Sequence, residues 1–154
     1  MARRVFFSFH YERDVWRAGP VRNSWVTKSD REEAGFWDAA AWEEVKKKGD
    51  DAIKRWIDKY LEGTSVTIVL IGAETAGREW VKYDGLLGIY IHNMKDQYGR
   101  TDSKGENPFG EFYIEENGRK KYLSEMYPTY DWVNDGGYYY LGNWVEDAAK
   151  NAGR

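Results

Sequence analysis

The sequence predicts an α/β fold, an open parallel sheet with helices on both faces. Three short runs are apolar without polar alternation, which is typical of strands covered on both sides. They span residues 5–9, 67–71 and 86–91. An amphipathic helix is expected between the first two runs and another helix at the end of the chain. Strand, helix and strand in this order are the pattern of a doubly wound sheet.

The helix between the first two runs has a clear period. Apolar side chains recur three or four residues apart and so share one helix face. They are Ile53, Trp56, Ile57, Tyr60 and Leu61. Asp50 or Asp51 can cap the start of this helix, and Gly63 lies just past its end.

The closing helix is expected over residues 138–152. Its apolar side chains also fall at helical spacing, which predicts a face that packs against the sheet. They are Tyr140, Leu141, Trp144, Val145, Ala148 and Ala149.

Other segments carry weaker signals. Residues 14–27 could form a helix, but Gly19-Pro20 is expected to start, kink or break it. Residues 36–48 are expected to enter as a short strand or loop and to become helical around Trp42. Residues 93–123 are polar and loop-like, with turns at Asn107-Pro108 and Asn117-Gly118.

One connection is short. If one strand ends at Ile71 and the next begins at Leu86, the crossover is residues 72–85, fourteen in number. A parallel crossover needs a dozen or more residues, usually with a helix. A helix over residues 75–84 would leave only Gly85 to reach the next strand. Either the connection is tight, or the chain lacks residues at this point.

Length and charge exclude several classes of protein. At 154 residues the chain is expected to form one domain over residues 1–154. The 23 basic and 26 acidic residues are interspersed and give a net charge of −3, which argues against nucleic acid as a partner. There is no cysteine, so disulfides, thiolate metal sites and cysteine nucleophiles are excluded.

No apolar run is long enough to span a bilayer or to act as a signal peptide. We therefore expect a cytoplasmic protein without membrane contact. The 8 Trp and 12 Tyr suit a ligand cleft or an interface, or simply a surface of half-buried rings. Tyr138, Tyr139 and Tyr140 fit either a partner face or packing of the last helix, and the sequence leaves both readings open.

Several segments together resemble the TIR-like proteins of the Thoeris anti-phage system. They are residues 4–11 (RVFFSFHY), 21–26 (VRNSWV), 64–72 (TSVTIVLIG), 80–84 (WVKYD), 104–109 (KGENPF) and 130–135 (YDWVND). The resemblance implies a flavodoxin-like TIR fold that cleaves the nicotinamide–ribose bond of NAD+. It also implies a nucleotide product, often a cyclised ADP-ribose, that diffuses to a separate effector protein.

Asp84 is the candidate catalytic residue that the resemblance implies. TIR enzymes usually carry a Glu four residues after a Trp, and four residues after Trp80 this chain has Asp84. The alternative is a solvated helix residue. Relatives also carry more chain after this acid and between Phe109 and the Tyr130 motif.

The substrate-facing groups are expected at the carboxyl ends of the strands, where open α/β sheets bind ligands. They are Ser8, Phe9, His10, Tyr11, Phe36, Trp37, Asp38 and Trp80. His10 could instead be a structural residue. Phe36 and Trp42 could pack in the core, and Trp80 could face the sheet.

No cofactor is expected, because NAD+ would be the substrate. Residues 72–77 lack the spacing of a dinucleotide-binding fingerprint. His10 and His92 are too few for a metal site. Self-association or a phage trigger is a further expectation from the resemblance. Two alternatives remain open, a non-catalytic TIR-like interaction module and a receptor for a small nucleotide.

Overall fold

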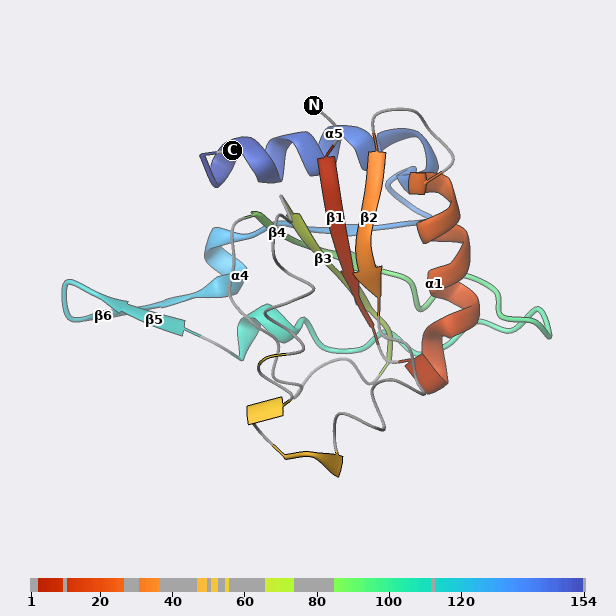
Figure 1. Ribbon diagram of the computed structural model, residues 1–154, viewed down its shortest axis with the longest axis horizontal. Helices are drawn as coiled ribbons and strands as arrows, with labels where there is room; N and C mark the ends of the chain where they lie inside the picture. The colour runs from red at the N-terminus through yellow and green to blue at the C-terminus, as the bar shows by residue number, and fades with distance from the viewer. Residues whose placement is uncertain are drawn as a thin grey trace.

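The strands of the main sheet are all parallel, in the order β2-β1-β3-β4-β7 (Figure 1). Their bounds are β1 Arg3–Ser8, β2 Arg31–Phe36, β3 Val66–Ile71, β4 Gly85–Tyr90 and β7 Thr129–Asp131. The chain leaves β1 for β2 on one side, and β3, β4 and β7 then follow on the other. This order is flavodoxin-like, which confirms the predicted fold class.

The computed structural model describes residues 3–9, 11–26, 31–36, 47–49, 51–52, 55, 66–73, 85–111 and 113–153. The helix expected between the first two apolar runs lies mostly outside these residues. Of that segment Asp51, Ala52 and Arg55 are described, and all three are helical. Trp42 lies outside the described residues.

Two faces of the sheet pack into two separate clusters. Alternate residues of β3 point to opposite sides, as in any strand. Ile68 and Leu70 pack with the residues of helices α1 and α5. Val69 and Ile71 pack on the other face with Phe109. Both faces are therefore covered, which explains why β3 and β4 are almost wholly apolar and why β1 is apolar from Val5 to Phe7.

Helix α1 spans Tyr11–Val26 and contains Pro20. Gly19-Pro20 was expected to start, kink or break a helix at residues 14–27. It neither starts nor breaks the helix, which begins earlier and continues through the proline. Pro20 lacks an N–H and so removes one helical hydrogen bond. Burial of Ala18, Val21 and Trp25 against the sheet offsets that loss.

Helix α5 spans Gly137–Asn151 and confirms the predicted closing helix. Its buried side chains include Leu141, Trp144 and Val145. Tyr140 was expected on this apolar face, but its side chain is 54% exposed. Tyr138 and Tyr139 are exposed as well. The start of α5 presents all three tyrosines to solvent.

Residues 93–123 contain more regular structure than predicted. The turn at Asn107-Pro108 is a short 3-10 helix, η1 (Pro108–Gly110), capped when the Asn107 side chain accepts a hydrogen bond from Phe109 N–H. The turn at Asn117-Gly118 joins two antiparallel strands, β5 (Tyr113–Glu116) and β6 (Arg119–Tyr122). Both turn residues have positive φ, the geometry of a two-residue hairpin.

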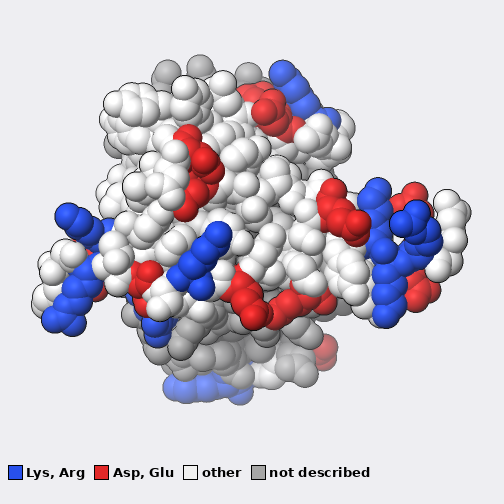
Figure 2. Space-filling model, turned by 180° about the vertical axis from the view of Figure 1, so that it is seen from behind, with Lys and Arg blue, Asp and Glu red and all other residues white. Residues whose placement is uncertain are grey.

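The β5–β6 hairpin projects from the body of the molecule (Figure 1) and is followed by helix α4 (Leu123–Met126). All eight of its strand residues are exposed. In Figure 2 the hairpin carries acidic and basic side chains next to one another. Within the described segments no helix combines the length and apolarity needed to cross a bilayer.

Candidate functional site

The strand order reverses between β1 and β3, so the carboxyl ends of these strands flank the point where open α/β sheets bind ligands. Ser8 ends β1 beside Val69 of β3. Helix α1 begins three residues later, at Tyr11. Gly72 follows β3 directly. We call this end of the sheet the carboxyl edge.

Two of the predicted substrate-facing residues are described with their side chains. Ser8 is 8% exposed and Phe9 is 4% exposed. Phe9 belongs to the core cluster formed with α1 and α5. Its ring therefore packs, and Ser8 is the predicted residue whose polar atom lies at the carboxyl edge.

Asp14 is the carboxylate that the structure places against the end of β3. Its side chain is fully buried. A Cβ added at Gly72 would overlap the Asp14 carboxyl group. Gly72 is thus required by close approach, because a larger residue would push the first turn of α1 away from the sheet.

Arg17 is the second buried charge at this edge, with 4% exposure. Its Nη1 lies 3.8 Å from the Asp14 carboxylate. Its Nε donates to the carbonyl of Met94 at 2.8 Å, and its Nη2 to that of Arg100 at 2.9 Å. One side chain therefore joins α1 to the segment after β4.

The segment after β4 also carries two aspartates whose pKa values are lowered. A side-chain hydrogen bond from Arg13 is the main cause for Asp102, with bond lengths of 2.8 and 3.0 Å. Backbone N–H donation from Arg100 is the main cause for Asp96. Both carboxylates lie within 4 Å of Arg17, so the edge is an ion-pair network of mixed sign.

This segment reaches back to the end of β3. A Cβ at Gly105 would overlap the carbonyl oxygen of Gly72. Residues 102–105 therefore lie directly on the carboxyl edge, beside the switch point of the sheet.

The remaining predicted site residues are not described with their side chains. For Tyr11 and Phe36 the structure describes the backbone, at the start of α1 and the end of β2. Outside the described residues lie His10, Trp37, Asp38, Trp80 and Asp84. Strand β4 begins at Gly85, so 72–84 is the whole crossover from β3.

Sequence reasoning missed Asp14 and Arg17. The available signal was weak, an acidic and a basic residue three apart on a helix that follows the first strand. Such pairs are usually solvated, and nothing local showed that Asp14 would meet Gly72. Apart from each other, the groups that they contact at Gly72, Met94 and Arg100 lie more than fifty residues away along the chain.

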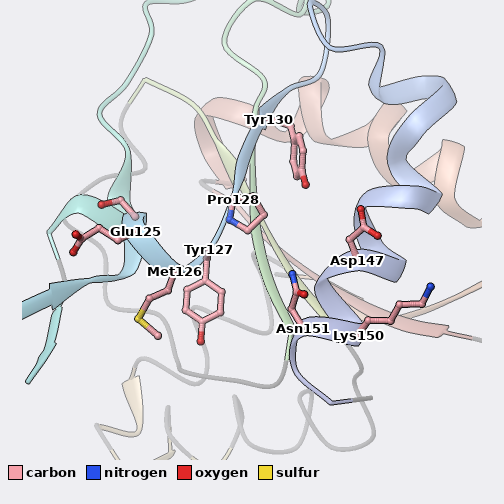
Figure 3. A pocket seen from close by; sticks show the side chains of 9 residues that line it. Glu125, Met126, Tyr127, Pro128, Tyr130, Asp147, Lys150 and Asn151 are labelled. Carbon is pink, nitrogen blue, oxygen red and sulfur yellow. The ribbon is translucent and has the colours of Figure 1, made fainter. Parts of the chain in front are cut away.

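A cavity of about 490 Å³ lies at the opposite edge of the sheet (Figure 3). It is bounded by the segment before β7 and by the last turns of α5. Its lining residues are Ser124, Glu125, Met126, Tyr127, Pro128, Tyr130, Asp147, Lys150 and Asn151. Burial, and then the charge of Asp147, raise the pKa of Tyr130. This cavity is distinct from the carboxyl edge where the substrate was predicted.

Together, the parallel sheet and its strand order define a flavodoxin-like α/β protein whose switch point lies at the ends of β1 and β3, beside the buried pair of Asp14 and Arg17. Residues 6–96 match the family described as "Thoeris protein ThsB, TIR-like domain". The chain belongs to this family, as its sequence motifs predicted.

A protein of Bacillus cereus (strain MSX-D12) is similar to this chain over most of its length. That protein is named "Putative cyclic ADP-D-ribose synthase ThsB1" and is 39% identical over 191 positions, which cover 94% of this chain and 100% of the relative. Because the chain has 154 residues, at least 37 of the 191 positions have no counterpart in it. The relative therefore has residues that this chain lacks.

Proposed function

We propose that this protein cleaves the nicotinamide–ribose bond of NAD+ and releases a cyclic ADP-ribose-type signal in bacterial anti-phage defence. The observation that carries the proposal is the relationship, over 94% of the chain, to a protein named as a cyclic ADP-D-ribose synthase. The switch point between β1 and β3 supports it, since this is the usual place for a nucleotide in such a sheet.

The chemistry requires little acid catalysis. The bond from ribose C1 to the nicotinamide nitrogen breaks, and its electron pair leaves with neutral nicotinamide. Positive charge develops at C1, as in glycoside hydrolysis. In hydrolysis, water then forms a bond to C1. In cyclisation, a nucleophilic atom of the same ADP-ribose forms that bond, and any proton released passes to solvent.

A carboxylate beside C1 would stabilise this charge and hold a ribose hydroxyl. We assign this role to Asp84, at the position of the usual Glu. Asp is one methylene shorter, and a displacement of about 1 Å can cost roughly 100-fold in rate. Ser8 and the first turn of α1 would face the ribose and phosphates.

The test is release of nicotinamide. Purified protein is incubated with NAD+, and free nicotinamide and the nucleotide product are separated by chromatography. Asp84→Asn should abolish release. Asp147→Asn is the matched control, because Asp147 is an exposed carboxylate at the opposite edge of the sheet and should leave release unchanged. Equal turnover by the Asp84→Asn variant would remove Asp84 from the mechanism.

A non-catalytic TIR-like module is the second candidate. Two observations favour it, Asp84 in place of Glu and the absence of at least 37 of the relative's aligned positions. Cells that express the protein should be assayed during phage infection, because a trigger would be missing from the purified assay. Release of nicotinamide in those cells supports the enzyme, and its absence there supports the module.

A further inference from the structure

A tight turn follows β4 at the carboxyl edge. Met94 N–H donates to the carbonyl of Ile91 at 3.1 Å, so His92 and Asn93 are the two central residues of a β-turn. The His92 ring packs edge-on against Tyr90, with centroids 6.0 Å apart. Neither His92 nor Asn93 was assigned to the predicted site.

The end of β7 holds Asn93 in one orientation. The Asn93 amide nitrogen donates to both carboxylate oxygens of Asp131, at 2.9 and 3.0 Å. Asp131 in turn accepts from Asn134 N–H at 2.9 Å. Burial alone would raise the pKa of Asp131, but hydrogen bonds from Asn134 and Asn93 help to lower it overall. Asp131 therefore fixes which way the Asn93 carbonyl oxygen points.

Two buried polar atoms of this turn have no hydrogen-bond partner within the described part of the chain. They are Nδ1 of His92 and Oδ1 of Asn93. A buried polar atom without a partner costs about 1–3 kcal/mol, so such atoms are rare in folded proteins. Oδ1 can only accept a hydrogen bond, and Nδ1 accepts one when it is unprotonated.

Residues 102–105 lie against this turn as well as against Gly72. Asp102 N–H donates to the carbonyl of His92 at 2.7 Å, and Lys104 Nζ lies 4.8 Å from the centre of the Tyr90 ring. The same short segment thus borders both the switch point and the turn.

We propose that His92 Nδ1 and Asn93 Oδ1 bind the two hydroxyls of a ribose. Two acceptors on adjacent residues match two donors on adjacent carbons, and among the described residues neither acceptor has a hydrogen-bond partner. This inference rests on the proposed function, because NAD+ supplies two riboses and its reactive end would lie near β1 and β3. The turn would then hold a ribose without touching the bond that breaks.

Binding of ADP-ribose tests the proposal apart from catalysis, since ADP-ribose lacks nicotinamide. Calorimetry at pH 8 would compare the wild-type protein with His92→Phe, which retains a ring to pack on Tyr90 but removes Nδ1. Loss of one hydrogen bond should weaken binding about tenfold. Gln97→Ala, at an exposed residue of the same segment, is the control and should bind as the wild type does.

A ligand-side comparison guards against misfolding of the variant. The two 2′-deoxy forms of ADP-ribose each lack one ribose hydroxyl. One of them should bind wild-type protein about tenfold more weakly than ADP-ribose. When the missing hydroxyl is the one that His92 binds, this ligand should lose nothing further in His92→Phe. Equal binding of all three ligands by the wild type, or full-strength ADP-ribose binding by His92→Phe, would overturn the proposal.

The nicotinamide assay distinguishes failure of this inference from failure of the proposed function. Suppose that the protein releases nicotinamide, but that the affinity for ADP-ribose is the same in His92→Phe and the deoxy ligands bind as tightly as ADP-ribose. The ribose-binding inference alone then fails. If the protein neither releases nicotinamide, in the purified assay or in infected cells, nor binds ADP-ribose, the proposed function fails with it.

Discussion

The guanidinium of Arg17 lies 3.8 Å from the carboxylate of Asp14, and both side chains are buried beside the end of β3. Arg17 also donates to the carbonyls of Met94 and Arg100. Helix α1, the end of β3 and the segment after β4 therefore meet at one cation. The geometry of the carboxyl edge depends on this pair.

Arg17→Met should destabilise the fold strongly. The change keeps an unbranched apolar side chain but removes the buried positive charge near Asp14, and breaking a buried ion pair costs about 3–5 kcal/mol. Urea unfolding measures the difference. Arg13→Gln is the control, because the Arg13 side chain is 38% exposed and its pair with Asp102 should contribute under about 1 kcal/mol. Equal losses in the two variants would contradict this interpretation.

Gly72→Ala should also be costly. The new methyl group would overlap the Asp14 carboxylate, and overpacking of this kind costs about 1–3 kcal/mol. Gly110→Ala is matched to it, since nothing lies within 4 Å of a Cβ there. Thermal unfolding of the two variants should differ by several degrees, and similar midpoints would show that α1 moves freely at this contact.

The Asp102 pair should make stability depend on pH. Its folded pKa lies below the ordinary value of 3.8, mainly through the hydrogen bond from Arg13. The stabilisation is therefore fully present above the unfolded pKa and is lost as pH falls through the folded pKa. Asp102→Asn should cost under about 1 kcal/mol at pH 7 and progressively less as pH falls below about 4. Urea unfolding of the wild type and of Asp102→Asn at pH 7 and below about pH 4 measures this cost. A difference in unfolding free energy that does not change with pH would exclude the Arg13–Asp102 pair as its cause.

Helix α5 offers a paired test of packing. Leu141 is 1% exposed and Tyr139 is 78% exposed on the same helix. Leu141→Ala should cost about 2–5 kcal/mol, because it leaves a cavity between α5 and the sheet. Tyr139→Ala should change the free energy of unfolding by less than about 0.5 kcal/mol. A large loss at Tyr139 would show that its ring packs against the protein.

The central strands were predictable because burial on both faces demands continuous apolar sequence. Edge strands have no such demand. Strand β2 reads Arg-Glu-Glu-Ala-Gly-Phe, and β7 has three residues, so neither gave an apolar signal. The hairpin turn was visible at Asn117-Gly118, but its exposed strands were not.

The candidate site was predictable only where it follows strand ends. Ser8 was predicted because the residues after β1 must lie at the carboxyl edge. Asp14 and Arg17 were missed because their burial comes from residues distant in sequence. His92 and Asn93 were missed because the local sequence of a turn after a strand does not reveal that Asp131 contacts it. Long-range packing, which local patterns do not encode, decides these positions.

The β5–β6 hairpin buries none of its strand residues, so its length is not constrained by the interior of the protein. It lies between Phe109 and the Tyr130 motif, where relatives were expected to carry more chain. Insertions or deletions there should accumulate during evolution without cost to folding. A peptide tag placed between Asn117 and Gly118 would accordingly label the protein while leaving its five-stranded sheet intact.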